Sequence, residues 1–169
     1  MPIPVADRPT EPAGRSDACE LAMGGIWFNP RAREYRYFFH QWESARAATL
    51  DMCAKECLGA ATLIMLCARD LGVKQMALPA FMVETDSMVT VQCWERRSAG
   101  QSAGVAHALL AVDEATTLYD VSTYTYPTPH PRREEDAVSR AHWESMRDLT
   151  RPYRCVRVEI PAWWRTRWL

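Results

Sequence analysis

The sequence lacks an apolar run long enough to cross a bilayer, and it lacks a basic start followed by an apolar segment. We therefore expect neither a transmembrane helix nor a signal peptide. The expected location is cytoplasmic, with export by a signal-independent route left open. The sequence also lacks a charge excess, because 20 Lys and Arg residues face 21 Asp and Glu residues. This balance favours neither nucleic acid nor an anionic membrane as a partner, so we expect neither.

A close-set cysteine framework is also absent, because the six cysteines are spread along the chain and two of them fall in a charge-poor helical stretch. This pattern indicates reduced thiols rather than disulfides. The length of 169 residues suits one domain. Residues 1–18 contain four prolines and no aromatic residue, which predicts a flexible tail. Residues 19–169 are then expected to form the domain, and the sequence does not indicate an oligomeric state.

The most apolar stretch runs from Glu56 to Gly72, and the residues from 58 to 68 carry no charge. A segment of this length that is apolar on every side is typical of a helix buried in a protein core. Arg69 suits the negative end of such a helix, and Gly72 suits a left-handed C-cap. The sequence therefore predicts a central helix that ends at Gly72.

Cys57 lies near the predicted start of that helix, where free backbone N–H groups and the helix dipole stabilise a thiolate. A cysteine at this position can act as a nucleophile, whereas a small core hydrophobe is the simpler interpretation. The residues from Ser44 to Ala54 also have helical spacing. If both segments form one continuous helix, Cys57 loses the dipole, and its activation depends on a histidine.

Two apolar segments, 105–112 and 117–122, flank a polar tetrapeptide and predict an antiparallel hairpin. In the expected register, His107 lies diagonal to Asp120 on one face, at a backbone distance of about 7–8 Å. A thiolate nucleophile needs a base, and the base needs a partner that holds its tautomer. Cys57, His107 and Asp120 can fill these three roles. The predicted chemistry is acyl transfer through a thioester, with the Cys57 backbone N–H as one oxyanion donor.

These residues resemble the transglutaminase-like superfamily of papain-like cysteine enzymes over about residues 53–123. The similar motifs are Cys57-x3-Ala61, Arg69-x-x-Gly72-Val73, His107-Ala108 and Asp120-Val121-Ser122. The resemblance implies a Cys57-His107-Asp120 triad acting on peptide or protein amides as a peptidase, deamidase or transglutaminase. No cofactor and no metal are implied. The elements and the resemblance together give an α+β fold, in which a central nucleophile-bearing helix packs on an antiparallel sheet with flanking helices.

Two alternatives stay open at this point. The first is a non-catalytic relative that binds proteins through its aromatic segment 19–42 or its tryptophan-rich end 161–169, although we expect that end to dock on the body of the protein. The second is a metal site formed by Cys53, Cys57, His107 and Asp120, because the two cysteines are one helical turn apart. The acyl-transfer enzyme is the leading prediction.

Overall fold

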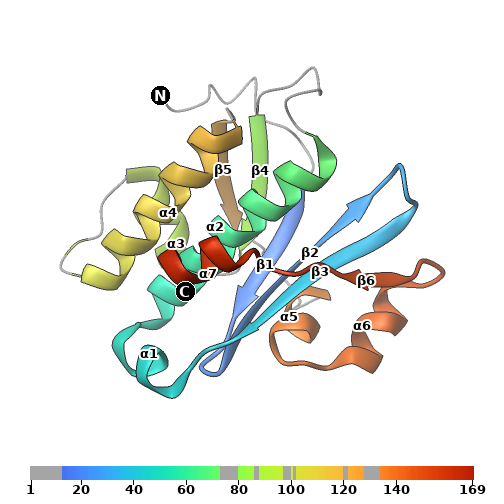
Figure 1. Cartoon of the computed structure of the whole chain (residues 1–169), viewed down its shortest axis with the longest axis horizontal. Helices are drawn as coiled ribbons and strands as arrows, with labels where there is room; N and C mark the ends of the chain where they lie inside the picture. The colour runs from blue at the N-terminus through green and yellow to red at the C-terminus, as the bar shows by residue number, and fades with distance from the viewer. Residues whose placement is uncertain are drawn as a thin grey trace.

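The computed structural model describes residues 13–72, 80–85, 88–96, 100, 102–119, 122–127 and 134–169, and the statements below refer to these residues. Three consecutive strands come first, and helices separate each of the later strands from the one before it (Figure 1). The strands are β1 (Gly14–Ala18), β2 (Ala22–Asn29), β3 (Glu34–Gln41), β4 (Ala80–Thr85), β5 (Ser122–Pro127) and β6 (Cys155–Arg157). The helices are α1 (Ser44–Thr49), α2 (Met52–Leu71), α3 (Met88–Arg96), α4 (Ala103–Tyr119), α5 (Glu134–Ser139), α6 (Trp143–Thr150) and α7 (Ala162–Trp168).

The six strands form one mixed sheet in the order β5-β4-β1-β2-β3-β6. The first three strands of the chain pair antiparallel, β1 with β2 and β2 with β3. The other pairings, β1 with β4, β4 with β5 and β3 with β6, are parallel. Strand β1 is therefore held between β2 and β4 near the middle of the sheet, so its side chains are covered on both faces.

Helix α2 forms the core on one face of the sheet. The Asp51 carboxylate caps its start by accepting from the Ala54 N–H at 2.8 Å, and Gly72 ends it in the left-handed conformation at φ 63°. Every residue from 54 to 68 is buried. The predicted central helix and its glycine cap are confirmed. Because α2 begins at Met52 and runs without a break, Cys57 lies in its second turn rather than at its start.

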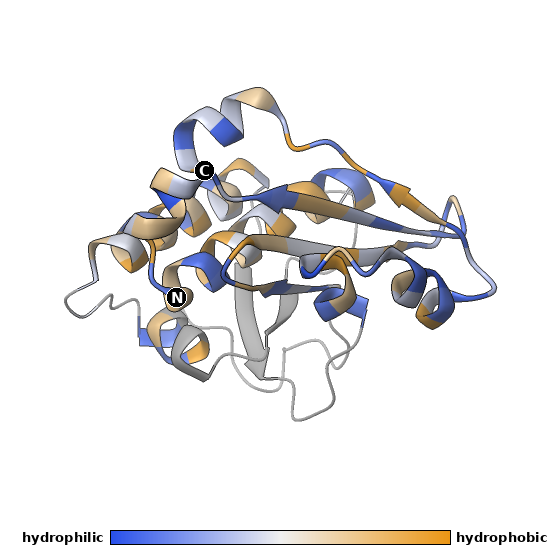
Figure 2. Ribbon diagram, turned by 90° about the horizontal axis from the view of Figure 1, so that it is seen from below, coloured by the Kyte–Doolittle hydropathy of each residue, from blue (hydrophilic) through white to orange (hydrophobic). Residues whose placement is uncertain are grey.

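Helices α5 and α6 pack on the other face of the sheet. Successive strand residues point to opposite faces. Accordingly, a Cβ built on Gly24 would meet Val138 of α5, whereas one built on Gly25 would come close to Leu63 of α2. Hydrophobic residues are found on the strands and on the helices packed against them (Figure 2). Two separate apolar clusters result, a large one around α2 and a small one under α5 and α6.

The C-terminal segment docks on the α2 side, as its tryptophans predict. Trp164 of α7 is fully buried, and its indole N–H donates to the Thr62 hydroxyl of α2 at 3.0 Å. Trp168 is 7% exposed and packs in the same cluster, whereas Trp163 stays 48% exposed. Helix α7 therefore completes the core around α2.

The α+β class is confirmed, but the predicted antiparallel sheet of a papain-like or transglutaminase-like domain is wrong, because the three pairings outside β1-β2-β3 are all parallel. The predicted hairpin over 105–122 is also wrong, since residues 103–119 form α4. Buried positions in α4 recur every three or four residues, which is helical spacing. A short alanine-rich run fits both the helical period of 3.6 residues and the strand period of two residues. The packing of α4 against α2 selects the helix.

The predicted tail is too long at its C-terminal end. Residues 14–18 form β1, the strand that joins the antiparallel and parallel halves of the sheet. The polar sequence of this strand gave no strand signal, and its pairing with β2 and β4 supplies the stabilisation that the local sequence lacks. Residues 1–12 of the predicted tail lie outside the described residues.

Candidate functional site

The residues of the predicted triad do not occupy the positions that the hairpin required. Cys57 is 0% exposed in the apolar interior around α2. His107 lies on α4, where its Nε2 is 3.0 Å from the backbone oxygen of Trp168 and its ring packs on the Trp168 indole. Asp120 lies outside the described residues. The strand that was to bring His107 beside Asp120 is a helix, so the geometric basis of the triad is lost.

A different set of polar residues meets at the end of β1. Asp17 on β1 and Glu56 on α2 are each 5% exposed. Glu56 Oε1 accepts from the backbone N–H of Ala18 at 3.0 Å, which holds α2 against the strand end. Asp17 Oδ2 accepts from the Ser139 hydroxyl of α5 at 2.5 Å. Helix α5 thus holds the Asp17 side chain on one face of β1, and α2 holds the backbone of the next residue through Glu56.

Asp136 on α5 adds a third carboxylate to this group. The Ser139 hydroxyl that holds Asp17 lies 3.2 Å from the backbone oxygen of Asp136. Arg140 donates from Nε to Asp136 Oδ1 at 2.8 Å. The pKa of Arg140 is raised, mainly by its hydrogen bond to Asp136 and further by the negative charges of Asp136 and Asp17. Because the Asp136 and Arg140 side chains are 21% and 39% exposed, the group opens to solvent on this side.

The turn between β1 and β2 closes the other side of the group. Lys55 is 4% exposed, and its ammonium group donates to the backbone oxygen of Glu20 at 3.0 Å. The Cys19 thiol donates to the backbone oxygen of Ser139 at 3.4 Å. This turn is therefore attached to α2 and to α5, the two helices that carry Glu56 and Asp136. We call Asp17, Glu56, Asp136 and Arg140 the carboxylate site.

Carboxylate oxygens are the ligands that Mg²⁺ and Mn²⁺ prefer. Among the described residues, no group of three or more His, Cys, Asp or Glu side chains is arranged to enclose a metal ion. The predicted Cys53-Cys57-His107-Asp120 metal site is therefore not found there, and one of its members lies outside the description. The carboxylate site offers a cation one or two carboxylates, and water or a bound ligand would have to supply the remaining oxygens.

Sequence reasoning missed this site because its members are far apart in the chain. Asp17 was assigned to the tail, Glu56 was the first residue of the apolar stretch that predicts the central helix, and nothing in the sequence around Asp136 pointed to a site. A usable signal was present at Asp17, since it directly precedes the apolar and aromatic stretch that forms β2 and β3. An isolated acidic residue at the start of such a stretch indicates a strand end, but the partners across the sheet cannot be read from it.

No family model and no curated protein matches the chain. Among solved structures, the chain is similar to the crystal structure of RNase H1 from the halophilic archaeon Halobacterium salinarum NRC-1. That similarity has a TM-score of 0.46 and 10% sequence identity, and it covers 81% of this chain and 92% of that chain. None of the helices that the structure describes is both long and apolar enough to span a bilayer.

The predicted function is corrected on these findings. The acyl-transfer enzyme with a Cys57-His107-Asp120 triad is wrong, because His107 lies on a helix and contacts the C-terminal segment, and Cys57 is buried in the apolar core. The predicted partners are corrected with it. The predicted peptide or protein substrate loses its basis together with the triad, and the predicted exclusion of nucleic acid, which rested on the overall charge balance alone, is withdrawn.

Proposed function

We propose that this protein is a divalent-cation-dependent hydrolase that cleaves the phosphodiester backbone of nucleic acid. The position of Asp17 and Asp136 on either side of the Ser139 hydroxyl, both close enough to Arg140 for their charges to raise its pKa, carries the proposal. Mg²⁺ is usually held through one or two carboxylates, with water and substrate phosphates completing its shell. A site with fewer than three enclosing protein ligands, open to solvent at Asp136 and Arg140, fits that mode of binding.

The balanced reaction is attack of water on phosphorus. The water oxygen forms a bond to phosphorus, one P–O ester bond breaks, and the leaving oxygen takes up a proton. A bound divalent cation supplies Lewis-acid polarisation of the phosphate and a more acidic attacking water. Asp17 and Asp136 supply the anionic oxygens at this position, and the Ser139 hydroxyl holds one oxygen of Asp17 in place.

Arg140 is the residue that can contact the phosphate itself. Its guanidinium binds Asp136 through Nε, and its side chain is 39% exposed, so its remaining N–H groups can reach an incoming oxyanion. Guanidinium groups match phosphate oxygens in a forked geometry. Arg140 therefore neutralises the site when it is empty and positions the substrate when phosphate enters.

The test is a cleavage assay with labelled single-stranded RNA, single-stranded DNA and an RNA–DNA hybrid. We expect cleavage of at least one of these with Mg²⁺ or Mn²⁺, and none after chelation. Asp17→Asn keeps the size of the side chain and removes its charge, so it should lower the rate by about 100-fold or more, a loss typical of removing one electrostatic contact to the transition state.

The matched control is Cys57→Ala, which removes the thiol of the rejected triad. We expect Cys57→Ala to cleave at the wild-type rate at temperatures where it is folded. Failure to cleave any of the three substrates with either cation would refute the proposal. A rate that is unchanged in Asp17→Asn would refute the assignment of the site.

A further inference from the structure

A second polar surface lies beside α6, away from the carboxylate site. A cavity of about 480 Å³ opens there, and its lining includes Arg147 of α6 together with Arg151 and Arg154 of the segment that leads into β6. Tyr153 lies between the last two arginines and is 37% exposed. Glu144 and Asp148 of α6 also contribute to the lining. Arginine is therefore the dominant charge of the cavity.

Ion pairs within the protein neutralise only part of the positive charge of these arginines. Arg154 donates to Glu34 Oε2 at 2.6 Å, and Arg151 lies 3.1 Å from Asp148, yet both arginine side chains are 78% exposed. The Arg147 side chain is exposed and makes no hydrogen bond or ion pair with another described residue. The pair of Arg151 with Asp148 is exposed on both sides, and such pairs contribute little to stability, so the Arg151 guanidinium can exchange partners at low cost.

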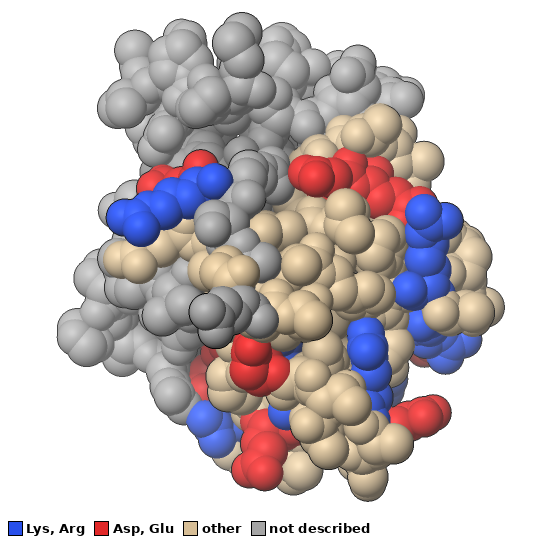
Figure 3. All heavy atoms as spheres, turned by 90° about the vertical axis from the view of Figure 1, so that its left-hand side faces the viewer, with Lys and Arg blue, Asp and Glu red and all other residues tan. Residues whose placement is uncertain are grey.

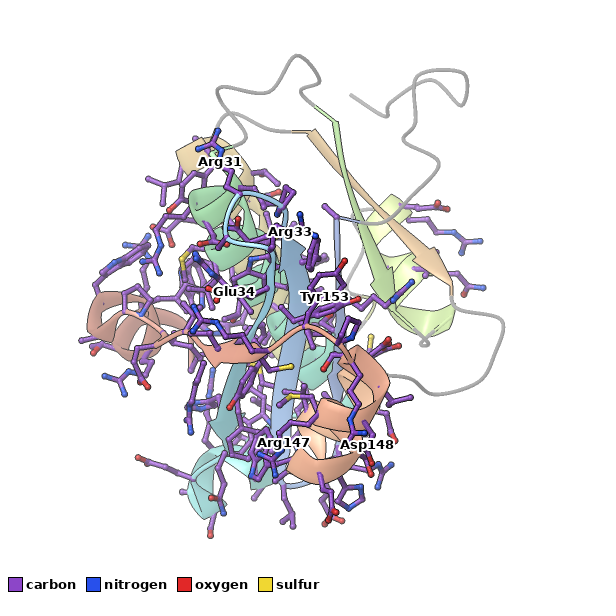
Figure 4. The ribbon with its side chains drawn as sticks, turned by 90° about the vertical axis from the view of Figure 1, so that its right-hand side faces the viewer. Arg31, Arg33, Glu34, Arg147, Asp148 and Tyr153 are labelled. Atoms are coloured by element: carbon purple, nitrogen blue, oxygen red, sulfur yellow. The ribbon has the colours of Figure 1, made fainter. Side chains whose placement is uncertain are left out.

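The turn between β2 and β3 extends the same surface. Arg31 and Arg33 are exposed, and neither side chain is paired with another described residue. Figure 4 shows both arginines on the face that carries Tyr153, Arg147 and Asp148. The backbone joins the two parts directly, because the N–H of Tyr35 donates to the backbone oxygen of Arg154 at 3.0 Å. We call Arg31, Arg33, Arg147, Arg151, Arg154 and Tyr153 the arginine surface.

We propose that the arginine surface binds the phosphate backbone of a nucleic acid strand outside the carboxylate site. The inference rests on the proposed function for its choice of nucleic acid. Each guanidinium presents a fork of N–H donors that matches a phosphate oxyanion, and several of them in a row match a chain of phosphates rather than a single one. Glu34, the acidic residue at the centre, is already neutralised by Arg36 and Arg154.

Tyr153 gives this surface a second means of holding a strand. Its ring packs edge-on against Phe28 and Tyr35, with centroids 4.9 and 6.2 Å away, so its orientation is fixed. A fixed, partly exposed aromatic ring between cations is the arrangement on which unpaired bases stack. The surface therefore suits a single strand or an unpaired end of nucleic acid.

Contacts of α5 connect the arginine surface to the carboxylate site. Tyr35 lies close enough to Glu134, Arg15 and Tyr153 for their charges to act on its pKa, which is raised mainly by burial. Arg15 and Glu134, 3.7 Å apart, join β1 to the first turn of α5, the helix that carries Asp136. Asp17, Asp136 and Arg140 of the carboxylate site thus lie on the α5 and α6 side of the sheet, as the arginine surface does. One strand can run from one site to the other.

The opposite side of the molecule provides a comparison. On the face that includes α4, acidic and basic side chains are scattered around a largely uncharged area (Figure 3). Arg69 of α2 and Arg96 of α3 are exposed arginines outside the arginine surface. They supply a matched control, because their removal changes the net charge by the same amount.

The experiment measures binding of labelled single-stranded oligonucleotides by fluorescence anisotropy, with the full chain and with EDTA present so that no cleavage occurs. We expect Arg147→Ala with Arg151→Ala to weaken binding about tenfold or more and to reduce the slope of log K against log salt by about 1.4, as loss of two phosphate contacts predicts. Tyr153→Ala should weaken binding about tenfold through lost stacking. Arg69→Ala with Arg96→Ala should bind as wild type.

The inference is overturned if the Arg147 and Arg151 double variant binds oligonucleotides with the same affinity as the Arg69 and Arg96 control variant. So does binding of anionic phospholipid vesicles with the same arginine dependence in the absence of oligonucleotide binding. If the Arg147 and Arg151 double variant melts early, Arg31→Ala with Arg33→Ala provides the same test on a separate turn. Oligonucleotide binding without cation-dependent cleavage would refute the proposed function and keep the inference. If Asp17→Asn abolishes cleavage, while the Arg147 and Arg151 double variant binds with wild-type affinity and still cleaves, the inference is refuted and the proposed function is kept.

Discussion

Adding one methyl group at Gly24 tests how the carboxylate site is assembled. Gly24 of β2 pairs directly with Asp17 of β1, so both residues face α5. A Cβ at Gly24 would lie 2.5 Å from Val138 Cγ1, 3.1 Å from the Ser139 nitrogen and 3.2 Å from the Phe38 oxygen. The absence of a side chain at this position lets α5 approach closely enough for Ser139 to bind Asp17.

The expected cost follows from these distances. Ordinary carbon contacts are about 3.5–4.0 Å, so Gly24→Ala has to displace α5 by about 1 Å. Overpacking of this kind costs about 1–3 kcal/mol, and alanine recovers about 0.5–1 kcal/mol of that because it loses less backbone entropy than glycine. We expect a net loss of about 1–2 kcal/mol, which lowers the melting temperature by about 2–8 °C for a chain of this size. Under the proposed function, misplacement by about 1 Å lowers cleavage by about 100-fold.

The assay is thermal unfolding followed by circular dichroism, together with the cleavage rate. Gly59→Ala is the matched control, because a Cβ there lies at ordinary contact distances of 3.7 and 3.8 Å from Met23. Gly59 is in the interior of α2, so alanine should stabilise the chain by up to about 1 kcal/mol. Cleavage by Gly59→Ala should match wild type.

Val138→Ala removes the methyl group that Gly24→Ala would strike. The two substitutions together should therefore cost less than the sum of their separate costs, by at least about 0.5 kcal/mol. A Gly24→Ala protein that melts at or above the wild-type temperature would refute the reasoning. Strict additivity of the two substitutions would show that the collision with α5 is not the cause.

Three further outcomes are expected. Thr62→Val leaves the buried indole N–H of Trp164 without its acceptor and should lower the free energy of unfolding by about 1–3 kcal/mol in a urea titration, whereas Trp164→Phe combined with Thr62→Val should recover part of that loss. The pKa of Glu34 is lowered from 4.5, first by its hydrogen bond to Arg154. The ionised Glu34 side chain therefore stabilises the folded protein above pH 4.5, and this stabilisation is lost as the pH falls through the lower pKa of the folded state. Melting temperatures measured below pH 4.5 should therefore fall less steeply for Glu34→Gln than for wild type; parallel curves would contradict this. Native iodoacetamide labelling read by peptide mapping should leave the fully buried Cys57 and Cys67 unmodified, and fast labelling of Cys57 would contradict its placement.

The sequence alone determined the elements whose signals are local. Helix α2 was predictable because its uncharged run, its terminal arginine and its capping glycine all lie within one stretch. The docking of α7 was predictable because three tryptophans within seven residues carry more apolar surface than a monomer leaves exposed. The α+β class followed from the mixture of helical and alternating patterns.

Only the tertiary structure decided the sheet order, the helical state of α4 and the carboxylate site. The short strand β1 has no strong strand signal, and it forms because β2 and β4 supply hydrogen bonds on both sides. Glu56 binds the backbone of β1 across 38 residues of sequence, and Ser139 binds Asp17 across 122 residues. Contacts between residues so far apart leave no periodic trace in the chain, because each carboxylate is locally an ordinary polar residue.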